Sequence, residues 1–104
     1  MYARVLHAEI QPGQLDEAVR RYRESLIPAA KGLPGFRGAL LLTEPGTGNA
    51  ISISLWETEA DLQAGEASGY VRAQLANIGP LFAAPPRFDV YQVSLQVPAP
   101  RAPE

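Results

Sequence analysis

The sequence predicts an α+β fold in which a four-stranded antiparallel sheet carries two helical regions on one face. Three observations support this prediction. Four segments have the composition, and most of them the alternation, of half-buried strands. The segment after the first of these strands spaces its apolar residues by three and four, as an amphipathic helix does. Pro-Gly followed by Gly-Asn separates the second strand from the third, which indicates a hairpin.

The N-terminal third of the chain is predicted to hold one strand and one helix. YARVLHAEI at 2–10 is read as a strand with imperfect alternation, ended by QPG at 11–13. The helix that follows has charged residues between the members of a single apolar stripe: Leu15, Ala18, Val19, Tyr22 and Leu26. We expect Pro28 to kink or fray the last turn, because proline has no N–H to donate, before KGLPG ends the helix.

A hairpin leads into the second helical region. Its strands are predicted at 36–44 and 50–57, joined by the turn PGTGN. Thr58 precedes Asp61 by three residues. Because this is the spacing of a capping box, we expect a helix to begin at about residue 59.

The second helical region is expected to contain a break. Gly65 and Gly69 are the candidate positions, and the helix is predicted to resume over 70–78. A connector at 79–86 then leads to a last strand at 87–95, which alternates apolar and polar residues.

The order of the predicted elements, β-α-β-β-α-β, is the split arrangement of ferredoxin-like folds. A chain of 104 residues has no room for a second core, so we expect one domain over 1–97. The remaining segment, 98–104, holds three prolines and is expected to be extended or disordered.

Composition and charge exclude several classes of function. The net charge is −2 and the basic residues are not clustered, which argues against a nucleic-acid or anionic-membrane partner. With no cysteine and one histidine, the chain offers no disulfide, no thiolate and no set of histidine ligands for a metal. The N-terminus lacks a signal-peptide pattern, and no apolar run approaches the ~20 residues of a membrane span. We therefore expect a cytoplasmic protein without a metal site.

Apolar residues on both faces of the predicted sheet indicate a homodimer. In the second strand, Phe36, Leu40 and Leu42 are assigned to one side. The third strand has three apolar residues on a single face: Ile51, Ile53 and Leu55. Two short helices can cover only one side of the sheet, and the other side would be an apolar patch too large for a soluble monomer. We expect a second copy of the chain to cover it, with the two sheets face to face.

Four segments, in this order, resemble the antibiotic biosynthesis monooxygenase (ABM) family of the dimeric α+β barrel superfamily. They are PGQLDEAVRRY, LPGFRGALLL, SISLWETEADLQAGEASGY and IGPLFAAPPRFDVYQV, and the resemblance spans residues 2–96. It implies a dimeric α+β barrel and one of several activities. These include oxygenation of quinol-like aromatic compounds without metal or organic cofactor, haem binding and degradation, and action on small signalling molecules.

The sequence resembles the haem-degrading members of the family only in part. They carry an Asn on the first strand, a Trp at the end of the third strand and an axial His in the second helical region. Trp56 matches the Trp, but the Asn position falls on Leu6 or His7, and no histidine lies between residues 58 and 86. We therefore do not expect haem degradation of that type.

Trp56, Ser52 and Ser54 share one face of the third strand and predict a ligand cavity between the sheet and the helices. In the cofactor-free oxygenases that the chain resembles, such a cavity is dry and offers donors to a developing oxyanion. Trp56 could supply its indole N–H, and Ser52 stands where some relatives carry Asn. The alternative is that Trp56 only fills the space between sheet and helices, with its N–H bonded to a carbonyl.

Three further side chains complete the candidate site. Tyr70 follows Gly69 at the expected helix break, where it could form a cavity wall, and Phe82 could close the cavity from below; both could equally be core. His7 is the only side chain that titrates near neutral pH, so it is the candidate general base, with Glu9 on the same side of its strand. The alternative is a histidine paired with a carboxylate at the sheet edge or dimer interface.

These observations favour a homodimer whose cavities oxygenate a small aromatic or quinol-like compound without any cofactor. The first alternative is a non-catalytic dimer that binds a small ligand or is associated with stress. The second is a haem binder with an axial ligand that the sequence does not identify.

Overall fold

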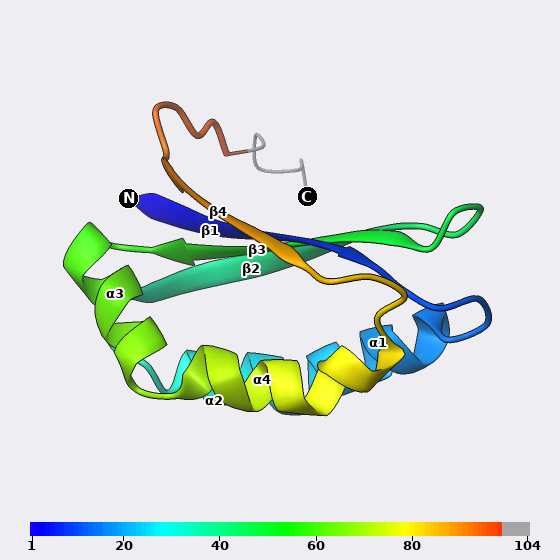
Figure 1. Cartoon of the computed structure of the whole chain (residues 1–104). Coiled ribbons are helices and arrows are strands. Elements are labelled where there is room, and N and C mark those ends of the chain that lie inside the picture. Colours follow the sequence, from blue (N-terminus) through cyan, green and yellow to red (C-terminus); the bar gives the residue numbers. More distant parts are fainter. Residues whose placement is uncertain (99–104) are drawn as a thin grey trace, which may run out of the picture.

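The computed structural model describes residues 1–98, and it confirms the predicted α+β fold. An antiparallel sheet with strand order β2-β3-β1-β4 is covered on one face by helices (Figure 1). The strands are β1 (Tyr2–Glu9), β2 (Phe36–Glu44), β3 (Asn49–Trp56) and β4 (Arg87–Gln92). The helices are α1 (Leu15–Arg21), a π-helical turn η1 (Tyr22–Leu26), α2 (Ile27–Lys31), α3 (Glu59–Ala67), α4 (Tyr70–Ile78) and a 3-10 turn η2 (Gly79–Leu81). Except for Pro98, the predicted tail at 98–104 lies outside the described residues.

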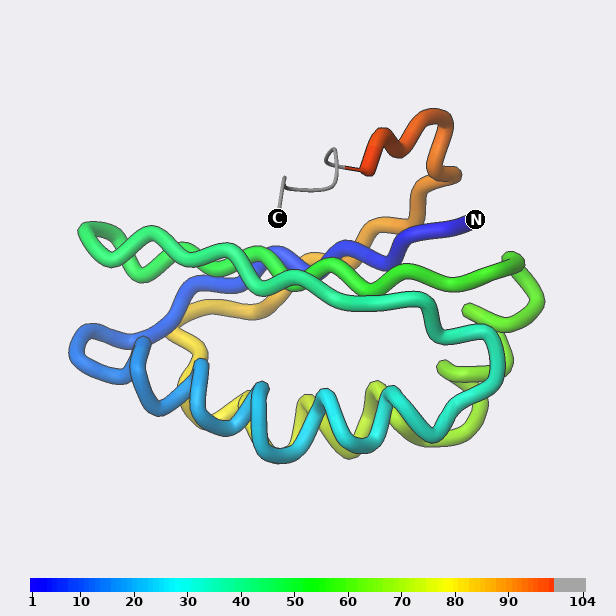
Figure 2. The backbone as a smooth tube through the Cα atoms, turned by 180° about the vertical axis from the view of Figure 1, so that it is seen from behind, coloured from blue at the N-terminus to red at the C-terminus, as the bar shows by residue number. Residues whose placement is uncertain are grey.

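The segments α1, η1 and α2 form one continuous helix that runs beneath the sheet (Figure 2). In η1 the N–H of Ile27 donates to the carbonyl of Tyr22, five residues back rather than four. Pro28 comes next, and it has no N–H while its ring crowds the carbonyl four residues earlier. A wider turn ahead of the proline relieves this crowding. The disturbance expected at Pro28 therefore takes the form of a π-helical turn, and the helix continues to Lys31.

A β-bulge near the start of β2 changes which of its residues share a face. Phe36 pairs with Trp56 and Gly38 pairs with Leu55, which leaves Arg37 as an extra residue in β2. Gly38 has a φ of +141°, a conformation that favours glycine. The prediction that Phe36 shares a side with the later leucines of β2 is wrong, because the bulge turns Phe36 to the helix side of the sheet.

The helix after β3 begins as predicted and breaks at the second of the two candidate glycines. Thr58 Oγ1 accepts a hydrogen bond from the N–H of Asp61 at 3.1 Å, which caps α3. Gly69 has a φ of +87° and separates α3 from α4. Gly65 lies inside α3, where a Cβ would stand 3.0 Å from Cη2 of Trp56. The absence of a side chain at Gly65 thus allows α3 to pack closely against Trp56 and does not serve a turn.

The last strand is shorter than predicted. β4 ends at Gln92 rather than at residue 95, and the N–H of Val93 donates to the carbonyl of Met1 at 2.9 Å. The following residues leave the sheet, and Leu95 and Val97 are 81% and 77% exposed. Alternation of apolar residues beyond Gln92 therefore does not reflect strand pairing.

The strand registers divide the side chains between a helix face and an open face. The apolar residues of β3 share the open face, as predicted, and the helices lie on the opposite side of the sheet (Figure 1). The open face carries Ala3, Val5, His7, Leu40, Leu42, Ile51, Ile53, Leu55, Arg87, Asp89 and Tyr91. Leu40, Leu42 and Tyr91 are about half exposed, at 55%, 48% and 55%.

The helix face holds the buried core. Ile10, Ala18, Ala50 and Leu81 form a buried cluster where the loop after β1 meets α1 and η2. No helix among residues 1–98 is long and apolar enough to cross a bilayer. Within the same residues, no group of three His, Cys, Asp or Glu side chains is placed to hold a metal ion.

Candidate functional site

A cavity of about 70 Å³ lies between the helix face of the sheet and the helices. All four strands contribute to its floor, and α1, η1 and α4 contribute to its roof. Most of the lining is aliphatic or aromatic, which favours an apolar ligand. The polar or charged lining residues are Arg4, Tyr22, Thr43, Ser52, Ser54, Tyr70 and Gln74.

Four of the five predicted ligand-binding residues line this cavity. Alternation along β3 directs Ser52 and Ser54 to the helix face, the first turn of α4 brings in Tyr70, and Phe82 follows η2. Trp56, the fifth, does not belong to the lining. That a ligand contacts these residues stays a prediction.

Trp56 lies on the same face of β3 as the two serines, beyond the cavity, and is only 1% exposed. Its Nε1 donates to Ser54 Oγ at 3.0 Å, so the expected donation of the indole N–H to a ligand is replaced by a bond within the protein. The rings of Phe36 and Tyr70 meet the indole edge-on, at centroid distances of 5.6 Å and 6.5 Å. Trp56 therefore contacts Ser54 and Tyr70 from outside the cavity and helps to hold them in position.

A pair of hydroxyl groups connects the floor of the cavity to its roof. Ser52 Oγ donates to Tyr22 Oη at 3.0 Å. Burial raises the pKa of Tyr22 above its ordinary value, although the hydrogen bond with Ser52 acts in the opposite direction. Tyr22 thus remains a neutral phenol at physiological pH.

Tyr70 and Arg4 lie close to this pair. Burial raises the pKa of Tyr70 well above its ordinary value, and the nearby Tyr22 adds to the increase, while the positive charge of Arg4 lowers it. Tyr70 therefore keeps its proton and can donate a hydrogen bond. Burial also lowers the pKa of Arg4, but a guanidinium stays charged at neutral pH. Arg4 Nη2 forms an ion pair with Oε1 of Glu66 on α3.

His7 lies on the open face of the sheet, on the side away from the cavity. Its Nε2 is 3.4 Å from Oδ2 of Asp89 on β4, and Arg87 Nε is 3.3 Å from the same oxygen. The carboxylate beside His7 is thus Asp89 on the neighbouring strand, and not Glu9 of its own strand. Strand alternation separates His7 from the cavity, so the structure does not bring the candidate base to the candidate ligand-binding residues.

Arg4 and Gln74 line the cavity and were missed from the sequence. The sequence alternation could have revealed Arg4, because this charged residue alternates in phase with Leu6 and Ala8 on the inward face of β1. Gln74 had no such signal on a helix with polar residues on several sides. Its Oε1 is buried and has no hydrogen-bond partner among the described residues.

The sequence profile of the antibiotic biosynthesis monooxygenase family matches residues 1–76. The chain belongs to this family. The matched region includes every polar residue of the cavity lining, and the resemblance inferred from the sequence is confirmed. No curated protein matches the chain.

Several solved structures share the family fold. A monooxygenase from the gene ActVA-Orf6 of Streptomyces coelicolor, solved with Nanaomycin D, is 16% identical, with a TM-score of 0.76 over 94% of this chain and 92% of its own. A variant of MhuD with two manganese protoporphyrin IX molecules per active site is 24% identical, with a TM-score of 0.76 over 95% and 100%. A protein of unknown function from Nitrosomonas europaea is 23% identical, with a TM-score of 0.71 over 95% of each chain. At these identities the likeness extends to the fold alone.

The residues of the cavity do not fit a haem. The single histidine, His7, faces the other side of the sheet, and the chain has no cysteine. Tyr22 and Tyr70 are the remaining ligand types in the lining, and their raised pKa values disfavour the phenolate form that would bind iron.

Proposed function

We propose that this ABM-family chain is a cofactor-independent monooxygenase acting on a small, electron-rich aromatic or quinol-like compound. The observation that carries the proposal is the mainly apolar cavity whose polar groups gather where Arg4 and the β3 serines face Tyr22 and Tyr70. An apolar cavity with a few placed donors suits a planar ring that carries an oxygen. The family and the monooxygenase among its structural neighbours support the reaction type.

The proposed reaction takes all of its electrons from the substrate. A phenol with a free para position loses its O–H hydrogen and its para C–H hydrogen. One atom of dioxygen enters the ring as the second carbonyl oxygen of a quinone, and the other leaves as water with both hydrogens. A deprotonated ring can pass an electron to dioxygen, so no external reductant is required. The chain contributes binding, exclusion of water and stabilisation of the oxyanion.

The cavity residues have distinct parts in this proposal. Tyr70 and Tyr22 donate hydrogen bonds to the ligand oxygen: the raised pKa of Tyr70 keeps its donor proton in place, and the proton of Tyr22 is free because its oxygen accepts from Ser52. Trp56 holds Ser54 and Tyr70 in position. Phe82, whose backbone bridges to that of Ile10, closes one end of the cavity.

The test is incorporation of label from 18O2 into the product of 1-naphthol, followed by mass spectrometry. Tyr70→Phe should lower the rate by about 10- to 100-fold, because a donor to the developing oxyanion is lost. Tyr91→Phe is the matched control, since Tyr91 lies on the open face, 55% exposed, and should keep the wild-type rate. Equal rates for both variants, or no labelled quinone from the wild type, would refute the oxygenase proposal.

A non-catalytic ligand-binding role is the second candidate. One observation favours it: no carboxylate or imidazole belongs to the lining of the cavity in residues 1–98. A substrate would therefore need to lose its proton to water or to enter already ionised. Saturable quenching of the fluorescence of Trp56, the single tryptophan, without any label incorporation would support binding without catalysis.

The open face of the sheet is the proposed contact between two copies of the chain. It has an apolar centre on β2, β3 and β1 and a polar end with His7, Arg87 and Asp89. Leu40 and Leu42 are each about half exposed in the single chain, which is unfavourable for a soluble monomer. Pairing two such faces would bury both apolar centres and complete a dimeric α+β barrel.

A further inference from the structure

Arg4 is the only charged side chain that lines the cavity in the described part of the chain. Its side chain is 11% exposed and shares the floor with Leu6 and Ala8 of the same strand. A guanidinium in such surroundings needs an anionic partner, because an unpaired buried charge is strongly unfavourable. Any ligand that fills the cavity must therefore leave Arg4 paired.

The present partner of Arg4 approaches from the solvent side. Glu66 on α3 has a side chain that is 43% exposed, and its Oε1 contacts Nη2 of the guanidinium. A guanidinium has further N–H donors in a planar fork, which suits a second oxygen. Tyr70 and Gln74 line the cavity together with Arg4, and Gln74 Oε1 has no hydrogen-bond partner. The inner side of Arg4 thus combines donors with an unpaired acceptor.

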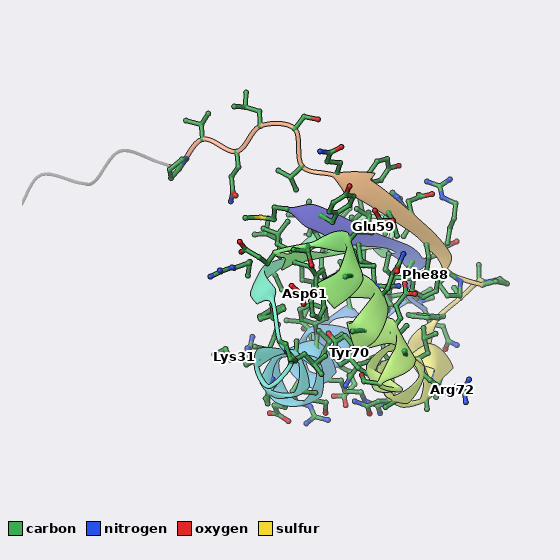
Figure 3. All side chains as sticks on the ribbon, turned by 90° about the vertical axis from the view of Figure 1, so that its left-hand side faces the viewer. Lys31, Glu59, Asp61, Tyr70, Arg72 and Phe88 are labelled. Carbon is green, nitrogen blue, oxygen red and sulfur yellow. The ribbon has the colours of Figure 1, made fainter. Side chains whose placement is uncertain are left out.

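The wall around Arg4 also separates the cavity from the surface. A shallow outer depression is lined by Arg4, Glu66, Val71, Arg72, Leu75 and Phe88. Four of these six residues, Arg4, Val71, Leu75 and Phe88, line the cavity as well. In Figure 3, Phe88 lies beside β4, facing the helices, while Arg72 extends outward from α4. No residue of α4 is fully buried.

We propose that Arg4 and Glu66 form the mouth of the cavity and that Arg4 selects aromatic ligands with an ionised ring oxygen. The ligand oxygen takes the place of Glu66 on the guanidinium, and the ring passes between β4 and α4 into the cavity. A neutral ligand cannot replace the carboxylate, so it leaves Arg4 paired with Glu66 and gains nothing from the guanidinium. This inference rests on the proposed function, and it specifies the substrate as a compound that enters in its deprotonated form.

The experiment compares two ring-matched probes by quenching of Trp56 fluorescence. The first, 2-hydroxy-1,4-naphthoquinone, is ionised at neutral pH, and the second, 2-methyl-1,4-naphthoquinone, is neutral. Arg4→Gln should weaken binding of the ionised probe by about 10- to 100-fold and change binding of the neutral probe by less than about twofold, because a charge-assisted hydrogen bond is lost. Glu66→Gln should tighten the ionised probe by about threefold or more, because the competing carboxylate is gone.

Two variants serve as matched controls. Arg72→Gln removes a cation from the outer depression without touching the cavity lining, and Glu59→Gln removes an exposed carboxylate from α3. Neither should change binding of either probe by more than about twofold, because neither residue lines the cavity. If Arg72→Gln weakens binding of the ionised probe as much as Arg4→Gln does, the probe is attracted by the positive charges of the surface in general. The proposal is then wrong.

A third variant covers the case that Arg4→Gln fails to fold. Arg4→Lys keeps the charge, so it should retain a preference for the ionised probe, reduced because a lysine cannot form the planar fork. Loss of that preference in a folded Arg4→Lys variant, judged by circular dichroism, would overturn the proposal. Because these readouts need no turnover, the Arg4 proposal stands or falls separately from the 18O2 test.

Discussion

At the scale of single residues, Trp56, Gly65 and Ser54 form one interlocked unit behind the cavity. The indole N–H donates to Ser54, and the ring lies against the backbone of Gly65, where a Cβ would come within 3.0 Å of Cη2. Glycine inside a helix is about 1 kcal/mol less favourable than alanine. Its presence in α3 is therefore offset by the closer approach of the helix to the sheet.

We predict that Gly65→Ala lowers the free energy of unfolding or leaves it unchanged, because the added methyl collides with the indole. Trp56→Phe should lower it by roughly 2–3 kcal/mol through lost packing. In the Trp56→Phe background, Gly65→Ala should instead raise the free energy of unfolding by about 0.5–1 kcal/mol, because only the preference of a helix for alanine over glycine remains. Urea unfolding of the four proteins measures this coupling.

The control for this cycle is Gly32→Ala. Gly32 follows α2 with a φ of −81° and a ψ of −5°, and a Cβ there would meet only the carbonyl oxygen of Ala29, at an ordinary contact distance of 3.7 Å. The substitution should raise the free energy of unfolding by a few tenths to about 1 kcal/mol in either background. If Gly65→Ala stabilises the wild type to the same extent, the contact with Trp56 is not what requires glycine.

At the scale of elements, an ion-pair network joins the two helical parts of the cavity roof. Glu17 accepts hydrogen bonds from Arg20 and from Arg21 Nε, the latter at 2.9 Å. Arg21 Nη1 also donates to the carbonyl of Asn77 in α4 at 2.8 Å. Glu17 therefore orients the arginine that ties α1 to α4.

This network predicts a pH dependence of stability. Hydrogen bonds from Arg20, and next from Arg21, lower the pKa of Glu17 from 4.5 to about 2. A carboxylate with a lowered folded-state pKa stabilises the fold above its unfolded pKa, and the contribution is lost as the pH falls from about 4.5 to about 2. Glu17→Gln should remove this part of the acid sensitivity, measured as the change in urea midpoint between about pH 6 and about pH 2.5.

Asp16→Asn is the comparison for Glu17→Gln. Asp16 is the neighbouring carboxylate in the same turn, and it forms no ion pair with a described residue. It should keep the wild-type dependence on pH. A Glu17→Gln variant with the same acid sensitivity as the wild type would show that the arginine contacts do not stabilise the fold.

At the scale of the whole molecule, the sheet separates two surfaces with different tasks. Successive residues of β1 and β3 alternate between the cavity and the open face, so Arg4 and Ser52 face the helices while His7 and Ile53 face away. One layer of helices can enclose a cavity on one side only. The other side is the open face, which we propose as the contact with a second copy of the chain.

We predict that Leu40→Asp shifts the chain from dimer to monomer. A carboxylate at position 40 on the open face would be buried unpaired in a dimer, which should weaken association by roughly 100-fold or more. Light scattering coupled to gel filtration measures the mass. Ala29→Asp, an exposed position on α2, is the control and should leave the mass unchanged. A wild type that remains a monomer at high concentration would refute the proposed dimer.

Much of this architecture could be predicted from the sequence. The order of strands and helices, the cap at Thr58 and the shared face of Ser52, Ser54 and Trp56 all follow from local periodicity and capping chemistry, which act over a few residues. The helix break and the disturbance near Pro28 were also anticipated, although the choice of Gly69 and the π-helical turn were not.

The errors share a different origin. The bulge that turns Phe36 inward, the end of β4 at Gln92 and the pairing of His7 with Asp89 all depend on which strand lies next to which. Periodicity in one segment carries no information about its neighbour in space.

The sequence by itself determined the elements, their order and the family resemblance. Only the tertiary structure decided that Trp56 gives its N–H to Ser54, that His7 is shut out of the cavity and that Arg4 enters it, because these depend on contacts between strands and helices far apart along the chain.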